Sequence, residues 1–124
     1  MAKILFIEDE PALQETLGDF LGEQGHAVLS ALDGEAGLEM VRRERPDLVL
    51  LDLILPRLHG IELLERMRQD PATAGTPVII LTNLESAEEV RRAIELGAKA
   101  YLVKTNYTLD EVLEKIQSVL GEQP

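Results

Sequence analysis

The chain of 124 residues has the length of one compact domain, and its 45% hydrophobic and 28% charged residues are typical of a globular protein. A formal net charge of -11 opposes direct binding to nucleic acid or to an anionic membrane, and the absence of cysteine excludes disulfides and thiolate metal sites. The apolar run at the N-terminus is too short for a signal peptide or a membrane span, so we expect a cytoplasmic protein.

Short apolar runs alternate with segments of helical period from the start of the chain. A strand is predicted over residues 3–7, and Pro11 lies in the first turn of a helix that Gly25 ends. A second strand is predicted over residues 26–30, and Asp33 is the expected N-cap of the second helix.

The second half of the chain continues this alternation. Residues 48–52 and 78–81 are continuous apolar runs, as expected of central parallel strands covered on both faces, and a helix is predicted between them. A shorter strand is predicted over residues 101–103. The helical spacing predicts that the core-facing positions include Leu13, Leu17, Phe20, Leu21, Ala36, Met40, Val41, Ile61, Leu64, Met67, Val112, Leu113, Ile116 and Leu120.

Two pairs of residues mark the starts of the last two helices. Ser86 with Glu89, and Thr108 with Glu111, have the spacing of capping boxes. The five strand–helix units that result predict an α/β fold, with a doubly wound parallel sheet and helices on both faces.

Polar residues follow four of the predicted strands. Glu8 and Asp9 come after the first, Asp52 ends the third, Thr82 follows the fourth and Lys104 the fifth. Open parallel sheets place their sites at the carboxyl ends of the strands, so these side chains are candidates for a common site.

The residue types at this edge suit phosphoryl chemistry. Three neighbouring carboxylates, from Glu8, Asp9 and Asp52, repel one another unless a cation relieves the charge, and Mg²⁺ is a hard ion that prefers such ligands. The hydroxyl of Thr82 and the ammonium of Lys104 can each hold a phosphoryl oxygen, as phosphoryl transfer requires.

Four separated segments together resemble the CheY-like receiver domain of response regulators. They are residues 6–10 (FIEDE), 51–60 (LDLILPRLHG), 81–82 (LT) and 101–104 (YLVK), in the order and spacing of that family. The resemblance implies a flavodoxin-like sheet of five strands in the order 2-1-3-4-5. It also implies that residues 1–124 form a single receiver domain without an output domain.

The resemblance further implies a role for each matching residue. Asp52 resembles the phosphoacceptor, which takes a phosphoryl group from a histidine kinase or a histidine phosphotransfer protein. A Mg²⁺ or Mn²⁺ ion would be held by Glu8, Asp9, Asp52 and the backbone carbonyl of Ile54. By this resemblance the domain is a phosphoacceptor that assists its own phosphorylation and dephosphorylation, and not an enzyme.

The resemblance also implies a conformational switch. Thr82 and Lys104 resemble the switch hydroxyl and the lysine that pairs with the phosphoryl group. Tyr101 resembles the switch aromatic, which alters the face made by the fourth helix, the fifth strand and the fifth helix and so controls a partner protein. Ile54 and Leu84 occupy positions that influence hydrolysis of the acyl phosphate in this family. Neither side chain can orient water by hydrogen bonding, so we expect a long-lived phosphoryl group.

The chain departs from the family after Lys104. Thr105 stands where these domains usually carry a proline with a cis peptide bond, so we expect either a trans bond with a different local loop or a cis bond held by surrounding contacts. Asn83 is larger than the small residue usual after the switch hydroxyl.

Three other readings fit parts of the pattern. A haloacid-dehalogenase-like phosphatase also uses an aspartate nucleophile, but it requires a second aspartate where Ile54 stands. A flavodoxin-like cofactor module would need a phosphate-binding loop in place of the acidic residues 8–10. The remaining alternative is a pseudo-receiver, which keeps the fold and binds proteins but is never phosphorylated.

Overall fold

The computed structural model describes residues 2–83 and 87–121 and contains one parallel sheet of five strands in the order β2-β1-β3-β4-β5. This order confirms the predicted doubly wound fold. The strands are β1 (Lys3–Ile7), β2 (Ala27–Ala31), β3 (Leu48–Leu51), β4 (Val78–Thr82) and β5 (Ala100–Val103). The helices are α1 (Pro11–Glu23), α2 (Gly34–Glu44), α3 (Gly60–Gln69), α4 (Ala87–Glu95) and α5 (Leu109–Gly121).

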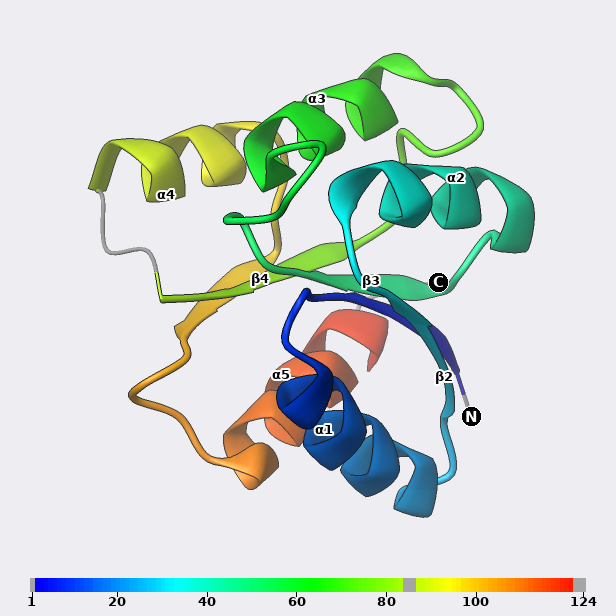
Figure 1. Cartoon of the computed structure of the whole chain (residues 1–124), viewed down its shortest axis with the longest axis vertical. Helices are drawn as coiled ribbons and strands as arrows, with labels where there is room; N and C mark the ends of the chain where they lie inside the picture. Colours follow the sequence, from blue (N-terminus) through cyan, green and yellow to red (C-terminus); the bar gives the residue numbers. More distant parts are fainter. Residues whose placement is uncertain (1, 84–86, 122–124) are drawn as a thin grey trace.

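The helices cover both faces of the sheet (Figure 1). Helices α1 and α5 lie on one face, and α2, α3 and α4 lie on the other. Each layer has its own apolar core, because successive strand residues point to opposite faces. Phe6 packs on the side of α1 and α5, whereas Leu5 and Ile7 pack on the side of α2 and α3.

Burial along the strands explains their sequences. Every residue of β3 and β4 is buried, which matches their continuous apolar runs. Strand β2 lies at an edge of the sheet, and only its last residue, Ala31, is fully buried. The central strands therefore bring their carboxyl ends together between the two helical layers.

The ends of several helices are fixed by the residues that the sequence singled out. The carboxylate of Asp33 accepts a hydrogen bond from the backbone N–H of Ala36 (2.8 Å), as an N-cap does. Thr108 and Glu111 form the expected reciprocal capping box, with bonds of 3.0 and 3.1 Å. Gly25 follows α1 with a positive φ of 95°, a conformation that favours glycine. The other predicted box depends on Ser86, which lies outside the described residues.

Several predicted boundaries were wrong by one residue. β2 begins at Ala27 and not at residue 26, and β3 ends at Leu51, so Asp52 is the first residue after that strand. The hydrogen-bonded pairing ends at the point where the chain turns toward the helix, and apolar character alone does not mark that point.

The predicted core faces were incomplete. Leu38, Leu63 and Val119 are buried although the pattern did not select them, whereas Met40 and Leu120 pack against the core as predicted but are only partly buried. The sheet on which a helix packs decides which neighbouring apolar position lies at the centre of the contact. Within the described residues, no helix is both long and apolar enough to cross a membrane.

Candidate functional site

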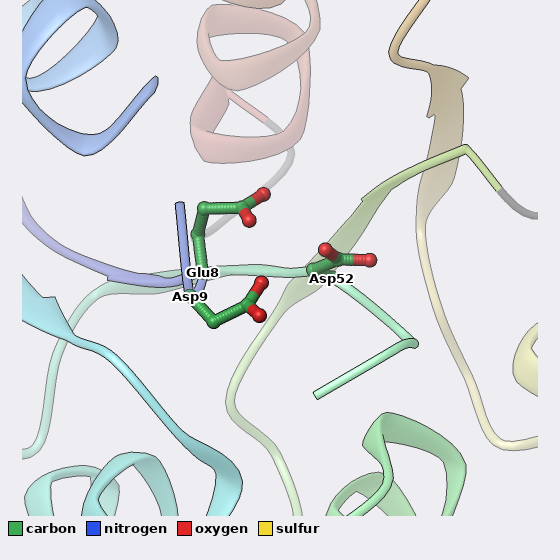
Figure 2. A group of neighbouring side chains, drawn as sticks. All are labelled: Glu8, Asp9 and Asp52. Carbon is green, nitrogen blue, oxygen red and sulfur yellow. The ribbon is translucent and has the colours of Figure 1, made fainter. Parts of the chain in front are cut away.

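Three acidic side chains meet at the carboxyl edge of the sheet. Glu8 and Asp9 follow β1, and Asp52 follows the adjacent strand β3. One carboxylate oxygen from each lies within 4.8 Å of the other two. Figure 2 shows the three side chains next to one another, with Asp9 below Glu8 and Asp52 beside both. Glu8 and Asp52 are 0% and 4% exposed, whereas Asp9 is exposed to solvent.

The ammonium group of Lys104 joins this cluster from β5. Its Nζ donates to Oδ2 of Asp52 (2.9 Å) and forms an ion pair with Oε1 of Glu8. The backbone N–H of Lys104 donates to the carbonyl of Thr82 (2.9 Å), which fixes the lysine against the end of β4. Lys104 therefore compensates charge on two buried carboxylates that the sequence separates from it by many residues.

The burial of these groups changes their pKa values. Burial raises the pKa of Glu8 from 4.5 to about 7, helped by the charge of Asp52 and opposed by the hydrogen bond from Lys104. Burial by itself would lower the pKa of Lys104, but its hydrogen bonds to Glu8 and Asp52 outweigh burial and raise it. Lys104 is therefore a cation at neutral pH, and Glu8 takes up a proton at about pH 7 instead of pH 4.5.

Backbone contacts fix the position of Asp52. Its N–H donates to the carbonyl of Ile7 (3.1 Å), and its Oδ1 accepts from the N–H of Ile54 (3.2 Å). A Cβ added at Gly60 would lie 2.6 Å from the carbonyl oxygen of Asp52 and 2.6 Å from the Cα of Leu53. A residue without a side chain is therefore needed where α3 begins, directly behind the candidate phosphoacceptor.

The structure places the other predicted site residues at different depths. Thr82 is fully buried at the end of β4, one strand away from Lys104. Ile54, two residues after Asp52, is 52% exposed. Tyr101 is 47% exposed and lines a groove between α4 and β5 with Val90. Leu84 lies outside the described residues, so its predicted role in hydrolysis has no structural description.

The loop after Lys104 follows one of the two expected courses. The Lys104–Thr105 peptide bond is trans, and the N–H of Asn106 donates to the carbonyl of Val103 (2.9 Å) in a tight turn. Tyr107 from this loop lines a shallow groove next to Lys104 together with the exposed Asn83. Sequence reasoning did not select Tyr107.

Gln14 is a second residue that sequence reasoning missed. It lies on α1, is buried, and donates to the backbone carbonyl of Glu8 (3.1 Å). A signal was present in the sequence, because Gln14 shares the buried face of α1 with Leu17 and Leu21. A polar residue on such a face has a specific hydrogen-bonding partner in most folded proteins.

The side chains fit a hard divalent cation. The cluster offers only carboxylate oxygens, which Mg²⁺ and Mn²⁺ prefer, and the carboxylate of Asp9 is exposed to solvent. Lys104 compensates part of the negative charge on the two buried carboxylates, and a bound cation would compensate the rest.

The chain matches the family model of the response regulator receiver domain over residues 4–117. The chain belongs to this family, which comprises the receiver domains of two-component response regulators. The match confirms the resemblance that the four sequence segments indicated.

A relative and two solved structures are similar over almost the whole chain. Protein PilH of Pseudomonas aeruginosa is 35% identical over 123 residues, which cover 98% of this chain and 99% of PilH. A CheY-like receiver domain protein from Methanospirillum hungatei superposes with a TM-score of 0.92 at 30% identity, covering 98% of this chain and 95% of that one. The receiver domain of the sensor histidine kinase PA1611 from Pseudomonas aeruginosa, with a magnesium ion coordinated in its active site cleft, superposes with a TM-score of 0.88 at 26% identity, covering 98% of each chain.

Many curated relatives are longer than this chain. It spans 15% of a gliding motility regulatory protein of Myxococcus xanthus, 49% of the transcriptional regulator RpaA of Synechocystis and 48% of a probable transcriptional regulator of Porphyridium aerugineum. Similarity to this chain therefore covers only the receiver portion of those proteins.

Proposed function

We propose that the domain accepts a phosphoryl group on Asp52 in a Mg²⁺-dependent reaction. The observation that carries this proposal is the cluster of three carboxylates within 4.8 Å, with Lys104 bonded to Asp52 at the same edge of the sheet. A buried aspartate between a cationic side chain and two further acids has the arrangement that an aspartyl-phosphate site requires.

The reaction transfers the group from a phosphohistidine. A carboxylate oxygen of Asp52 attacks phosphorus and forms an O–P bond while the P–N bond of the donor breaks. The electron pair of that bond goes to the imidazole nitrogen, which then takes a proton. The donor is therefore a histidine kinase or a histidine phosphotransfer protein, since the family operates in two-component systems.

Six residues have proposed roles around the transferred group. Lys104 turns its ammonium from the carboxylates toward a phosphoryl oxygen, and the hydroxyl of Thr82 donates to another. Glu8 and Asp9, with Asp52 and the carbonyl of Ile54, would hold the metal. Bound Mg²⁺ supplies charge neutralisation for the phosphoryl oxygens. The magnesium ion in the similar PA1611 receiver supports this assignment.

A conformational response would reach the surface through α4 and β5. Ala93 is the only buried residue among those that the structure describes in α4, so few apolar contacts resist a shift of this helix. Tyr101 is half-exposed beside α4, and inward rotation of its ring would change the face that a partner protein meets.

Mass spectrometry of the intact protein tests the proposal. The protein is incubated with a small acyl phosphate, with and without Mg²⁺, and compared with the Asp52→Asn variant. We expect one phosphate adduct that requires both Mg²⁺ and Asp52. An Asp47→Asn variant, which changes an acid outside the site, should keep the adduct.

The alternative is a pseudo-receiver, and the same experiment separates the two. A well-folded wild-type protein that gains no adduct from the acyl phosphate or from a phosphorylated histidine phosphotransfer protein would support the pseudo-receiver. An adduct that persists in Asp52→Asn would place the acceptor elsewhere.

A further inference from the structure

The side-chain amide of Gln14 lies where three backbone carbonyls converge. Its Nε2 is 2.9 Å from the carbonyl oxygen of Phe6, 3.0 Å from that of Ala31 and 3.1 Å from that of Glu8. These carbonyls belong to the end of β1, the end of β2 and the first residue after β1. One side chain thus joins three segments of backbone directly behind the acidic cluster.

The direction of this amide is set by its surroundings. All three neighbours are acceptors, so the NH₂ group and not the oxygen must face them. The oxygen Oε1 is buried and has no hydrogen-bond partner among the described residues. Burying an unpaired carbonyl oxygen is unfavourable, but this arrangement places both N–H donors of the amide among the three carbonyl acceptors.

The contacts fix the backbone from which the acidic side chains project. The N–H of Glu8 donates to the carbonyl of Ala31 (3.0 Å), which also accepts from Gln14. The carbonyl of Glu8 accepts from Gln14, so both polar backbone groups of Glu8 are held. Beyond this point the chain turns, and the N–H of Glu10 donates to Oε2 of Glu8 (3.1 Å).

We propose that Gln14 is a positioning residue for the metal site: it holds the backbone of Glu8 so that the carboxylates of Glu8 and Asp9 face Asp52 before the cation binds. The inference rests on the proposed metal-dependent function and adds a residue that lies behind the cluster and touches neither metal nor phosphoryl group. Loss of such supporting contacts weakens metal binding about tenfold or more in other proteins.

Isothermal titration with Mg²⁺ tests the proposal on wild type and Gln14→Met, which keeps the length of the side chain and removes its donors. We expect about a tenfold weaker affinity in Gln14→Met. The control is Leu21→Ala, which removes buried side-chain atoms about two turns further along the same helix and should lower stability. Leu21→Ala should bind Mg²⁺ within about twofold of wild type, since additivity holds for sites without shared partners.

A second measurement uses wild-type protein alone and remains decisive if Gln14→Met does not fold. Without metal, the side-chain NH₂ of Gln14 should exchange with solvent far more slowly than that of the exposed Gln24. On addition of Mg²⁺, its nuclear magnetic resonance signal should shift with the same midpoint as the calorimetric titration, whereas the Gln24 signal stays in place.

The outcomes separate this inference from the function on which it rests. Equal Mg²⁺ affinity in wild type and Gln14→Met, or a Gln14 signal that does not respond to Mg²⁺ while calorimetry detects binding, would overturn the role of Gln14 alone. Absence of Mg²⁺ binding by wild-type protein would overturn the metal-dependent function together with it.

Discussion

At the scale of single residues, Lys104 is the main counterion of the acidic cluster. Its ammonium contacts both Glu8 and Asp52, and its side chain is only 10% exposed. In the absence of metal, removal of this cation would leave buried carboxylates without compensation, which is strongly unfavourable.

We therefore predict that Lys104→Met lowers the free energy of unfolding by about 3 kcal/mol in metal-free buffer. Denaturant titration measures this loss, and added Mg²⁺ should restore part of it. Lys99→Met removes the same charge from an exposed position and should change the free energy of unfolding by less than about 0.5 kcal/mol. Equal effects of the two substitutions would contradict the role of Lys104 as counterion.

The raised pKa of Glu8 makes the free energy of unfolding depend on pH. Its pKa is raised to about 7 in the folded protein, so between pH 4.5 and 7 the folded state holds more protons at Glu8 than the unfolded chain does. Its contribution to stability is complete below pH 4.5 and is lost as the pH rises through 7.

We predict that, without metal, the Glu8 contribution falls by at most about 3 kcal/mol between pH 5 and pH 8. The measurement is the free energy of unfolding against pH for wild type and Glu8→Gln. The variant lacks the titrating group, so its profile should be flatter in this range. Parallel profiles would show that the pKa of Glu8 is not raised in the folded protein.

At the scale of elements, the start of α3 supports the end of β3. The N–H of Gly60 donates to the carbonyl of Leu53 (2.9 Å), and a methyl group there would overlap the backbone of Asp52. Because backbone atoms cannot move aside as a flexible side chain can, a substitution must shift Asp52 or the start of the helix.

Gly60→Ala is accordingly predicted to destabilise the protein by about 2 kcal/mol and to slow phosphorylation of Asp52. Thermal denaturation and the rate of adduct formation in the mass spectrometer measure the two effects. Gly22→Ala is the matched control, because nothing lies within 4 Å of the added methyl group on α1. It should raise stability by about 0.5 kcal/mol and leave the rate unchanged.

Helix α5 depends on its capping box. Thr108 and Glu111 satisfy each other's backbone N–H groups before the first turn of the helix. We predict that Thr108→Ala costs about 1 kcal/mol of stability, measured by denaturant titration. Ser118→Ala, on the exposed side of the same helix, removes a hydroxyl that has no capping role and should not destabilise. A loss of the same size in Ser118→Ala would argue against the cap.

At the scale of the whole molecule, charge links folding to cation binding. The net charge of -11 is concentrated in part in a site that is assembled only when β1 and β3 pair. A cation that binds the folded state and not the unfolded chain stabilises the fold by mass action.

We predict that Mg²⁺ at about 100 times its dissociation constant adds about 2.7 kcal/mol to the free energy of unfolding. NaCl of equal ionic strength controls for general screening and should add far less. In Asp9→Asn the gain from Mg²⁺ should shrink, because one ligand is lost. An equal gain from NaCl would assign the effect to screening.

The sequence by itself determined the element order, the central position of β3 and β4, the helix caps at Asp33 and Thr108, and the residues at the strand ends. These features depend on local chemistry and on periodicity, which short segments carry. The roles of Asp52, Thr82, Lys104 and Tyr101, and the extent of a single domain over residues 1–124, stay predictions.

Only the tertiary structure decided how these residues interact. Lys104 meets Glu8 because β5, β4, β3 and β1 lie in that spatial order, which differs from their order along the chain. The pKa of Glu8 follows from burial under two helical layers, and Gln14 reaches its three carbonyls only after α1 packs on the sheet. Contacts between distant segments and exclusion of solvent exist only in the folded chain, so no local pattern encodes them.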